Sequence, residues 1–218
     1  MSGAELRAVP LGDSAITIAL GTVRSPELLK VVHATAAALA AEKLPEVQDI
    51  VPAYLGVAVF YNSLQTPYSE LAEKLLAACE RASTLRPATG DSREHEIRVT
   101  YDGADLEQVS ISCGISVDEV IARHSGRTYT VDLLGFVPGF GYLSELDPSL
   151  HLPRRPQPRP RVPAGSVAIA GAQTAVYPLD TPGGWHIIGR TDQAMFDAER
   201  DPPALFRAGD SVRFVPAP

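Results

Sequence analysis

LGFVPGFGYL, residues 134–143, combines three glycines and one proline with three aromatic residues. Glycine and proline are typical of turns, whereas apolar runs are typical of strands and helices. The segment follows a short run at residues 128–134 that has the composition of a strand. We therefore predict that its glycines and proline shape a bend leaving that strand, while Phe140 and Tyr142 face a pocket or a partner.

A phosphate-binding loop is excluded for this stretch. A Walker loop requires a lysine after its second glycine, and no lysine follows Lys74 anywhere in the chain. The dinucleotide pattern G-x-G-x-x-G fails as well, because Gly139-Phe-Gly141 is not followed by the third glycine. The bend is therefore expected to pack or to recognise something other than a phosphate.

The overall composition is that of an ordinary globular protein. The chain has 218 residues, of which 45% are hydrophobic and 21% charged, and this length allows one large domain or two small ones. A net charge of −7 argues against sequence-independent nucleic-acid binding, which depends on basic patches. The start lacks a signal-peptide pattern, and no apolar run approaches the roughly 20 residues of a membrane span. We expect a cytoplasmic protein that does not bind a membrane.

Metal and disulfide sites are not expected. Cys79 and Cys113 are the only cysteines, and the five histidines include no pair spaced for one helix face. A serine-hydrolase elbow, G-x-S-x-G, is absent. We predict no metal and no cofactor bound by this chain.

The first half of the chain alternates strand and helix signals. Residues 14–20 alternate polar and apolar side chains, and Ser25-Pro26-Glu27 has the N-cap serine, first-turn proline and acid of a helix start. The predicted order is strand 14–20, helix from 26, strands 49–51 and 55–61, helix from 67, and strand 96–101. This β-α-β-β-α-β order is typical of a ferredoxin-like sandwich.

The second half is predicted to consist mainly of short strands. Ser116 and Glu119 form the capping-box pattern of a helix that reaches His124, and residues 105–109 form a shorter helix. The predicted strands are 128–134, 166–170, 174–177, 185–188 and 211–215. Short strands with frequent turns are typical of a barrel or sandwich. We therefore predict an α+β chain of two domains, residues 1–92 and 93–218.

Two segments have the composition of a binding site. PRRPQPRPRVP, residues 153–163, has five prolines that impose an extended path and four arginines that hang from it. It is either a solvated loop or an arginine edge that grips a carboxylate, carbonate or phosphate. In DTPGGWHIIGRT, residues 180–191, a Pro-Gly-Gly turn precedes the only tryptophan, Trp185. That tryptophan either plugs a barrel or lines a pocket for a small polar ligand.

Three long motifs carry a family resemblance. GFVPGFGYL, PRRPQPRPRVPAGSVAIAG and QTAVYPLDTPGGWHIIGRT, in this order, resemble the family of KipI and the 5-oxoprolinase B component, also called allophanate hydrolase subunit 1. The resemblance implies a ferredoxin-like domain over residues 1–92 and a cyclophilin-like β-barrel over 93–218. It also implies one component of an enzyme that acts with a homologous C component and with an A component. Such complexes use ATP to convert 5-oxo-L-proline to L-glutamate, and this chain is expected to be inactive alone.

Two other roles within the family remain open. One is a carboxyltransferase or allophanate hydrolase-type component of urea or amide metabolism. The other is a regulatory protein that inhibits a histidine kinase by binding it.

The resemblance also implies which residues line the site. They are Phe140, Gly141, Tyr142, Arg154, Arg159, Arg161, Gln173, Tyr177, Pro182, Gly183, Gly184, Trp185, His186 and Arg190. The arginines would neutralise negative charge, and the aromatic residues would exclude water and position a flat lactam or ureido ring. His124 and Arg190 are the candidate catalytic residues. His124 is either a proton carrier or a helix-end cation that stabilises the helix dipole.

Overall fold

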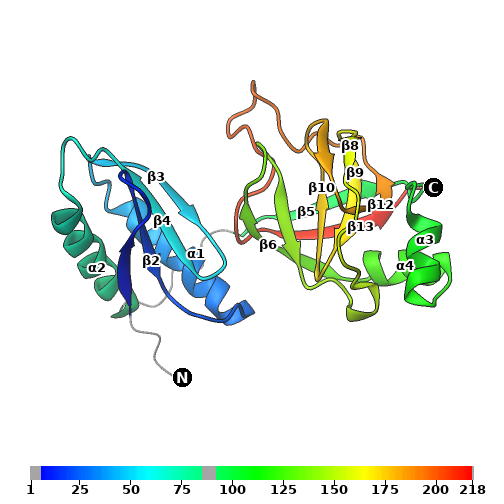
Figure 1. The fold of residues 1–218 in the computed structure, drawn as a ribbon, viewed down its shortest axis with the longest axis horizontal. Helices are drawn as coiled ribbons and strands as arrows, with labels where there is room; N and C mark the ends of the chain where they lie inside the picture. The colour runs from blue at the N-terminus through cyan, green and yellow to red at the C-terminus, as the bar shows by residue number, and fades with distance from the viewer. Residues whose placement is uncertain (1–5, 85–91, 218) are drawn as a thin grey trace. The chain divides into compact units, whose positions relative to one another are not determined.

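The computed structural model describes residues 6–84 and 92–217. Contacts between residues divide the chain into two compact units, Met1–Asp91 and Ser92–Pro218. Both units contain helices and strands, so the fold is of the mixed α+β class (Figure 1). No helix in the described ranges has the length and apolar character needed to cross a bilayer.

Unit 1 is an antiparallel sheet with both of its helices on one face. The sheet has the order β1-β2-β4-β3, and the helices share one apolar core with it. Its elements are β1 (Arg7–Pro10), β2 (Ala15–Ala19), α1 (Pro26–Ala41), β3 (Val47–Pro52), β4 (Gly56–Tyr61) and α2 (Tyr68–Thr84). Alternate residues of β2 and β4, such as Ile18 and Val57, are fully buried, as a half-covered sheet requires. The predicted start of α1 is confirmed, because the Ser25 hydroxyl accepts a hydrogen bond from Leu28 N at 3.1 Å.

One predicted strand pairing is wrong. The strand expected at residues 96–101 is β5 (Glu94–Val99), but it pairs in parallel with β13 (Ser211–Pro216) in unit 2. Its buried side chains, Ile97 and Val99, belong to the core of unit 2. The edge beside β2 is occupied instead by β1, which sequence reasoning missed. Element order alone does not determine pairing when the partner strand lies more than a hundred residues away.

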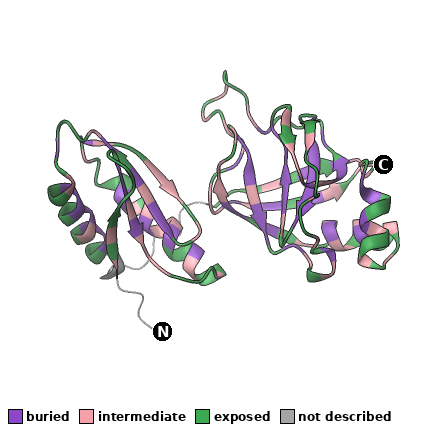
Figure 2. Cartoon of the chain, in the orientation of Figure 1, coloured by how far each residue is buried: buried purple, intermediate pink, exposed green. Residues whose placement is uncertain are grey.

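Unit 2 is a nearly closed barrel-like sheet. Its seven strands have the order β12-β9-β10-β7-β6-β13-β5. The remaining strands of this sheet are β6 (Thr128–Leu134), β7 (Gly141–Ser144), β9 (Ser166–Ala170), β10 (Gln173–Val176) and β12 (His186–Arg190). The two edges meet just after β5, where Thr100 and Arg190 exchange two backbone hydrogen bonds of 2.9 Å. The inward side chains of these strands form the buried interior visible in Figure 2.

Two helices, a short turn and a ribbon complete unit 2. They are α3 (Leu106–Cys113), α4 (Val117–Ser125), the 3-10 turn η1 (Pro148–Leu150), and β8 (Arg159–Val162) paired with β11 (Thr181–Gly183). The capping box predicted at Ser116 and Glu119 is confirmed at the start of α4. The arginine- and proline-rich segment therefore ends in a short paired strand rather than continuing as a free loop.

The junction between the two edges of the barrel leaves no room for a side chain at residue 103. Gly103 N donates to Ile188 O at 3.2 Å, and a Cβ atom at this position would overlap the backbone of residues 187–189. A glycine is therefore required where residues 100–105 run alongside β12.

We expect Gly103→Ala to lower the free energy of unfolding of the chain by about 1–3 kcal/mol, because the backbone at this junction must move apart. Urea-unfolding curves measure this loss. Gly135→Ala is the matched control, since its Cβ would make only ordinary contacts at 3.6 Å and 3.7 Å. Equal unfolding midpoints for the two variants would contradict the close approach at Gly103.

Candidate functional site

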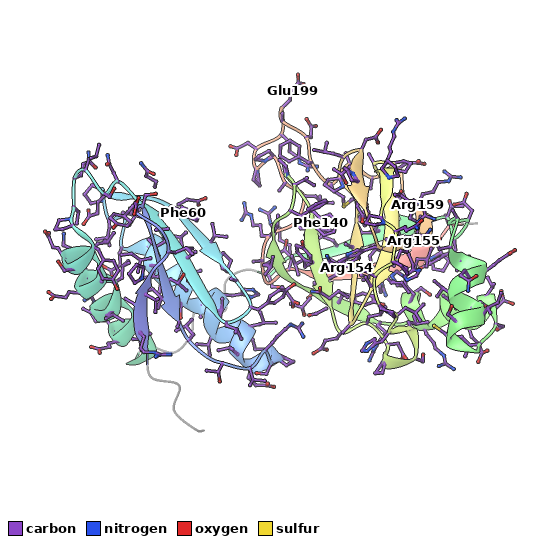
Figure 3. The ribbon with its side chains drawn as sticks, in the orientation of Figure 1. Phe60, Phe140, Arg154, Arg155, Arg159 and Glu199 are labelled. Atoms are coloured by element: carbon purple, nitrogen blue, oxygen red, sulfur yellow. The ribbon has the colours of Figure 1, made fainter. Side chains whose placement is uncertain are left out.

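A buried carboxylate lies at the centre of the candidate site. Asp105 is 3% exposed, and it directly precedes α3. Its Oδ1 accepts hydrogen bonds from Arg155 Nη1 and Arg159 Nη2, both at 2.7 Å. Its Oδ2 accepts from Arg159 Nη1 at 2.9 Å and from Ile187 N at 2.7 Å. Asp105 thus joins the start of α3, the arginine segment and β12. Figure 3 labels three arginines of this segment, Arg154, Arg155 and Arg159.

The environment of Asp105 keeps its side chain ionised. Burial raises the pKa of the Asp105 carboxyl, but the hydrogen bonds from Arg159 and the Ile187 backbone oppose this effect. The charges of Arg159 and Arg155 add to them, and together these contacts hold the pKa below its ordinary value. The carboxylate is therefore a permanent counter-charge for the two arginines at neutral pH.

The other predicted arginines differ in their partners. Arg161 Nε donates to Asp180 at 2.8 Å, and Arg190 Nε donates to Asp102 at 2.9 Å. Arg154 is exposed, and it forms no ion pair with any residue that the structure describes. The predicted arginine edge is therefore largely neutralised by carboxylates of the chain itself.

Four aromatic side chains pack beside the arginine segment. Phe140 is 2% exposed, and its ring centroid lies 4.9 Å from Tyr142, 5.4 Å from Tyr177 and 5.7 Å from Trp185. Tyr142 is half-buried, whereas Tyr177 and Trp185 are buried. Phe140 supports this aromatic group from within and does not face outward as expected, since its neighbours already cover the ring.

The Pro-Gly-Gly turn fits closely over Tyr177. Any side chain at Gly183 would overlap the Tyr177 hydroxyl, while Pro182 is exposed and Gly184 has ordinary space around it. Burial raises the pKa of Tyr177, and the phenol is hydrogen-bonded to the Trp185 backbone. The turn thus brings the Tyr177 phenol and the Trp185 indole to the same place, and the ligand pocket expected there stays a prediction.

Gly141 and Gln173 are placed by neighbouring strands. They are the first residues of β7 and β10, which pair with each other. Gly141 is buried, and a Cβ atom there would lie 3.0 Å from the Phe206 ring. Gly141 therefore has a packing role, while Gln173 is half-buried at the strand end.

The predicted bend at residues 134–143 is confirmed. β6 ends at Leu134 and β7 begins at Gly141, and Gly135 N donates to Phe140 O at 3.1 Å across the turn. Sequence reasoning missed one feature: Phe136 has a φ of 70° and is 59% exposed. Positive φ is unfavourable for a bulky residue, so the loop holds this ring outward at a conformational cost.

His124 is a structural residue of the core. Its Nδ1 accepts from the Tyr101 hydroxyl at 2.7 Å, and its Nε2 lies 2.9 Å from Thr174 Oγ1. Since the Thr174 hydroxyl donates to Ala168 O at 3.1 Å, Nε2 must carry the proton. Burial lowers the pKa of His124 to about 3, so the ring is neutral. A neutral, fully enclosed imidazole cannot stabilise the helix dipole as a cation, and it has no route to a ligand.

Arg190 lies in a different place from the aromatic group, at the junction between the barrel edges. A cavity of about 350 Å³ opens there. Its lining residues are Glu96, Arg98, Thr100, Arg190, Thr191, Asp192, Gln193 and Ala217. Glu96 and Asp192 balance Arg98 and Arg190 in this lining, so the cavity has no net charge that would favour an anion. It shares only Arg190 with the predicted site.

A metal site does not emerge from the side-chain arrangement. Within residues 6–84 and 92–217, no three His, Cys, Asp or Glu side chains gather closely enough to hold an ion.

Sequence reasoning missed the two residues that organise the arginine segment, Asp105 and Arg155. An aspartate directly before a helix is typical of an N-cap, which gives it a local explanation. In the structure the Asp105 side chain makes no capping hydrogen bond to α3. The available signal was a four-arginine segment, which needs counter-charges wherever it becomes buried.

Comparisons with known proteins identify the family. The family "Carboxyltransferase domain, subdomain C and D" matches residues 6–206. The chain belongs to this carboxyltransferase-domain family. The B subunit of 5-oxoprolinase from Escherichia coli O157:H7 is 46% identical over 176 residues, 79% of this chain and 79% of that protein. The B subunit of 5-oxoprolinase from Bacillus subtilis (strain 168) is 39% identical over 217 residues, 94% of this chain and 90% of that protein. The resemblance predicted from the three motifs is thus confirmed.

Solved structures of other proteins share the fold. The crystal structure of TTHA0988 is 40% identical and superposes with a TM-score of 0.83 over 94% of this chain. This chain spans 40% of the length of TTHA0988. The urea amidolyase of K. lactis is 16% identical, with a TM-score of 0.77 over 97% of this chain and 15% of that protein. At that identity the likeness concerns the fold alone.

We expect the His124 ring to stay neutral from pH 8 to pH 5, because burial disfavours its charged form. Long-range ¹H–¹⁵N NMR spectra over this range should show an unchanging Nε2–H tautomer. In the urea-unfolded chain the same imidazole should titrate near its ordinary value of about 6.5. A midpoint near 6.5 in the folded chain would contradict its enclosure.

We expect Asp105→Asn to lower the free energy of unfolding by about 3 kcal/mol at pH 7, since two arginines lose their buried counter-charge. Because the folded pKa of Asp105 lies below its ordinary value, the stabilisation is complete above pH of about 4 and is lost as the pH falls through the folded pKa. Urea unfolding at pH 7, 5 and 3 gives the free energy of unfolding of wild type and variant. The difference between these two free energies should narrow only at pH 3.

The control for this series is Asp180→Asn, which removes an exposed partner of Arg161 and is expected to lower the free energy of unfolding much less than Asp105→Asn does. A difference between wild type and Asp105→Asn that stays constant from pH 7 to pH 3 would show that the charge of Asp105 is not what stabilises the fold.

Proposed function

We propose that the chain is the B component of an ATP-dependent 5-oxoprolinase, which converts 5-oxo-L-proline to L-glutamate together with an A and a C component. One observation carries this proposal: relatives named as the B subunit of 5-oxoprolinase are 46% and 39% identical over 79% and 94% of the chain. The three motifs on which the resemblance depends also come together in unit 2, around Phe140, Asp105 and Trp185.

The chemistry of this region fits a small cyclic amide that carries a carboxylate. Tyr142 is half-buried and is backed by the buried rings of Phe140 and Trp185, so it offers an apolar contact for a flat five-membered ring. Arg154 is exposed and offers a cation for a carboxylate, and its two neighbours in the chain are hydrogen-bonded to Gly184 and His186, on either side of Trp185. In this proposal the chain binds and orients the substrate while water is excluded by the aromatic group.

The chain is proposed to be inactive alone. The two candidate catalytic residues support this: His124 is enclosed and neutral, and Arg190 is paired with Asp102 away from the aromatic group. The groups that activate water and consume ATP are therefore assigned to the complex with the A and C components. A cytoplasmic location, where such a complex would meet its metabolite, is part of the same proposal.

The finer fold assignment is also a proposal. Unit 1 has the strand order of a ferredoxin-like sandwich, with β1 in the edge position that the strand after the second helix would otherwise take. Unit 2 is assigned as a cyclophilin-like barrel on the basis of its nearly closed seven-stranded sheet and the family resemblance.

Reconstitution tests the proposed reaction. With the A and C components, ATP and 5-oxo-L-proline, glutamate is expected to form only when this chain is present, as measured by an amino-acid assay. Omitting ATP or either partner is expected to abolish the product. If the A and C components reach the full rate without this chain, the proposal fails.

A second candidate function is carboxyl transfer in urea or amide metabolism, which the family description favours. The two functions differ in their dependence on biotin. Avidin is expected to leave 5-oxoprolinase activity of the complex unchanged, whereas a carboxyltransferase that uses carboxybiotin would be blocked.

A further inference from the structure

We propose that Arg154 is the residue that binds the substrate carboxylate, and that the other arginines of the segment at residues 153–163 hold the fold instead. The proposal rests on the proposed function for the identity of the ligand, 5-oxo-L-proline. It assigns carboxylate recognition to a single side chain and separates it from the aromatic surface that receives the ring.

The four arginines of the segment differ in whether they already have a carboxylate partner. Arg155 and Arg159 share the buried Asp105, and Arg161 is paired with Asp180. Recruiting any of these three for a ligand would require breaking an existing ion pair. Arg154 is exposed and has no such partner among the described residues, so its donors are available to an incoming carboxylate.

Backbone hydrogen bonds fix the residues on both sides of Arg154. His186 Nε2 donates to Pro153 O at 2.9 Å, and Arg155 N donates to Gly184 O at 2.8 Å. The residues before and after Arg154 are therefore attached to the turn that carries Trp185. An arginine on so constrained a backbone loses less freedom on binding than one on a free loop.

The charges around Arg154 favour an anion. The backbone at Arg154 lies beside the turn that carries Trp185, because its two neighbours are bonded to His186 and Gly184. Directly after it in the chain, Arg155 shares one carboxylate with Arg159, and this group of three charges retains a net charge of +1. An anion that contacts Arg154 thus meets a second favourable field from Arg155 and Arg159.

Hydrogen bonding beside Arg154 is incomplete. Arg155 Nε and His186 Nδ1 are buried, and neither has a hydrogen-bond partner among the described residues. Such groups are rare and destabilising in a finished fold. Arg155 directly follows Arg154, and His186 lies next to Trp185 and is bonded to Pro153 O. This position indicates that a ligand or another protein of the complex completes the hydrogen bonding here.

The test compares Arg154→Gln with Arg123→Gln in the reconstituted complex with the A and C components. Arg123 is the control because it is a half-exposed arginine on α4 whose ion-pair partner among the described residues is Glu119 of its own helix. We expect Arg154→Gln to raise KM for 5-oxo-L-proline by about 10- to 100-fold with kcat within about threefold, the loss typical of one charge-assisted contact. Arg123→Gln should change neither constant.

A second measurement follows the Arg154 Nε–H signal of the full chain by ¹H–¹⁵N NMR. Titration with 5-oxo-L-proline is expected to shift this signal, whereas 2-pyrrolidinone, the same ring without the carboxylate, should not. The Arg123 signal should stay unchanged with both compounds.

The outcomes distinguish this inference from the proposed function. An active complex whose KM is unaffected by Arg154→Gln overturns the inference and leaves the function intact. Loss of complex assembly in Arg154→Gln, with normal KM in whatever complex remains, overturns it in favour of a partner contact. A wild-type complex without 5-oxoprolinase activity overturns the function. In that case the NMR titration decides the inference, which fails if the Arg154 signal does not shift.

Discussion

The Asp105 carboxylate is the interaction on which the candidate site depends. It accepts four hydrogen bonds from two separate parts of unit 2, the arginine segment and β12, and it is almost fully excluded from water. A buried carboxylate is tolerated only when its charge is compensated, and the two arginines likewise lose their counter-charge if it moves. The arginine segment, β12 and the start of α3 are therefore held together, and the geometry of each depends on the other two.

The contacts of Asp105 show that the basic segment at residues 153–163 serves mainly to hold the fold together. Four arginines within eleven residues look like a surface for anions, yet three are committed to carboxylates of the same chain. Their stabilising role also fixes the path of the chain past the Pro-Gly-Gly turn, where Gly183 makes room for the Tyr177 hydroxyl. Charge pairing thus positions an aromatic surface and leaves one guanidinium beside it.

Local signals in the sequence predicted local structure well. The N-cap at Ser25 and the capping box at Ser116 lie where expected, and the strands at 128–134 and 166–170 have the predicted bounds. These features depend on neighbouring residues, which the sequence displays directly. The pairing of β5 with β13, and of Asp105 with arginines 50 and 54 positions later, depends on the folded chain. Neither periodicity nor composition encodes such distant contacts, and so the role of Asp105 was missed.

The same reasoning separates recognition from catalysis in this chain. A histidine at a helix end is a natural candidate for proton transfer. In His124, however, both ring nitrogens are hydrogen-bonded inside the core, to Tyr101 and to Thr174. A proton carrier needs access to the reacting group and a pKa near the working pH, and His124 has neither. Near the aromatic group lie the exposed Arg154 and two buried polar atoms, Arg155 Nε and His186 Nδ1, that have no hydrogen-bond partner among the described residues; these are means of binding rather than of bond cleavage. These features fit a protein that orients a ligand and neutralises its charge.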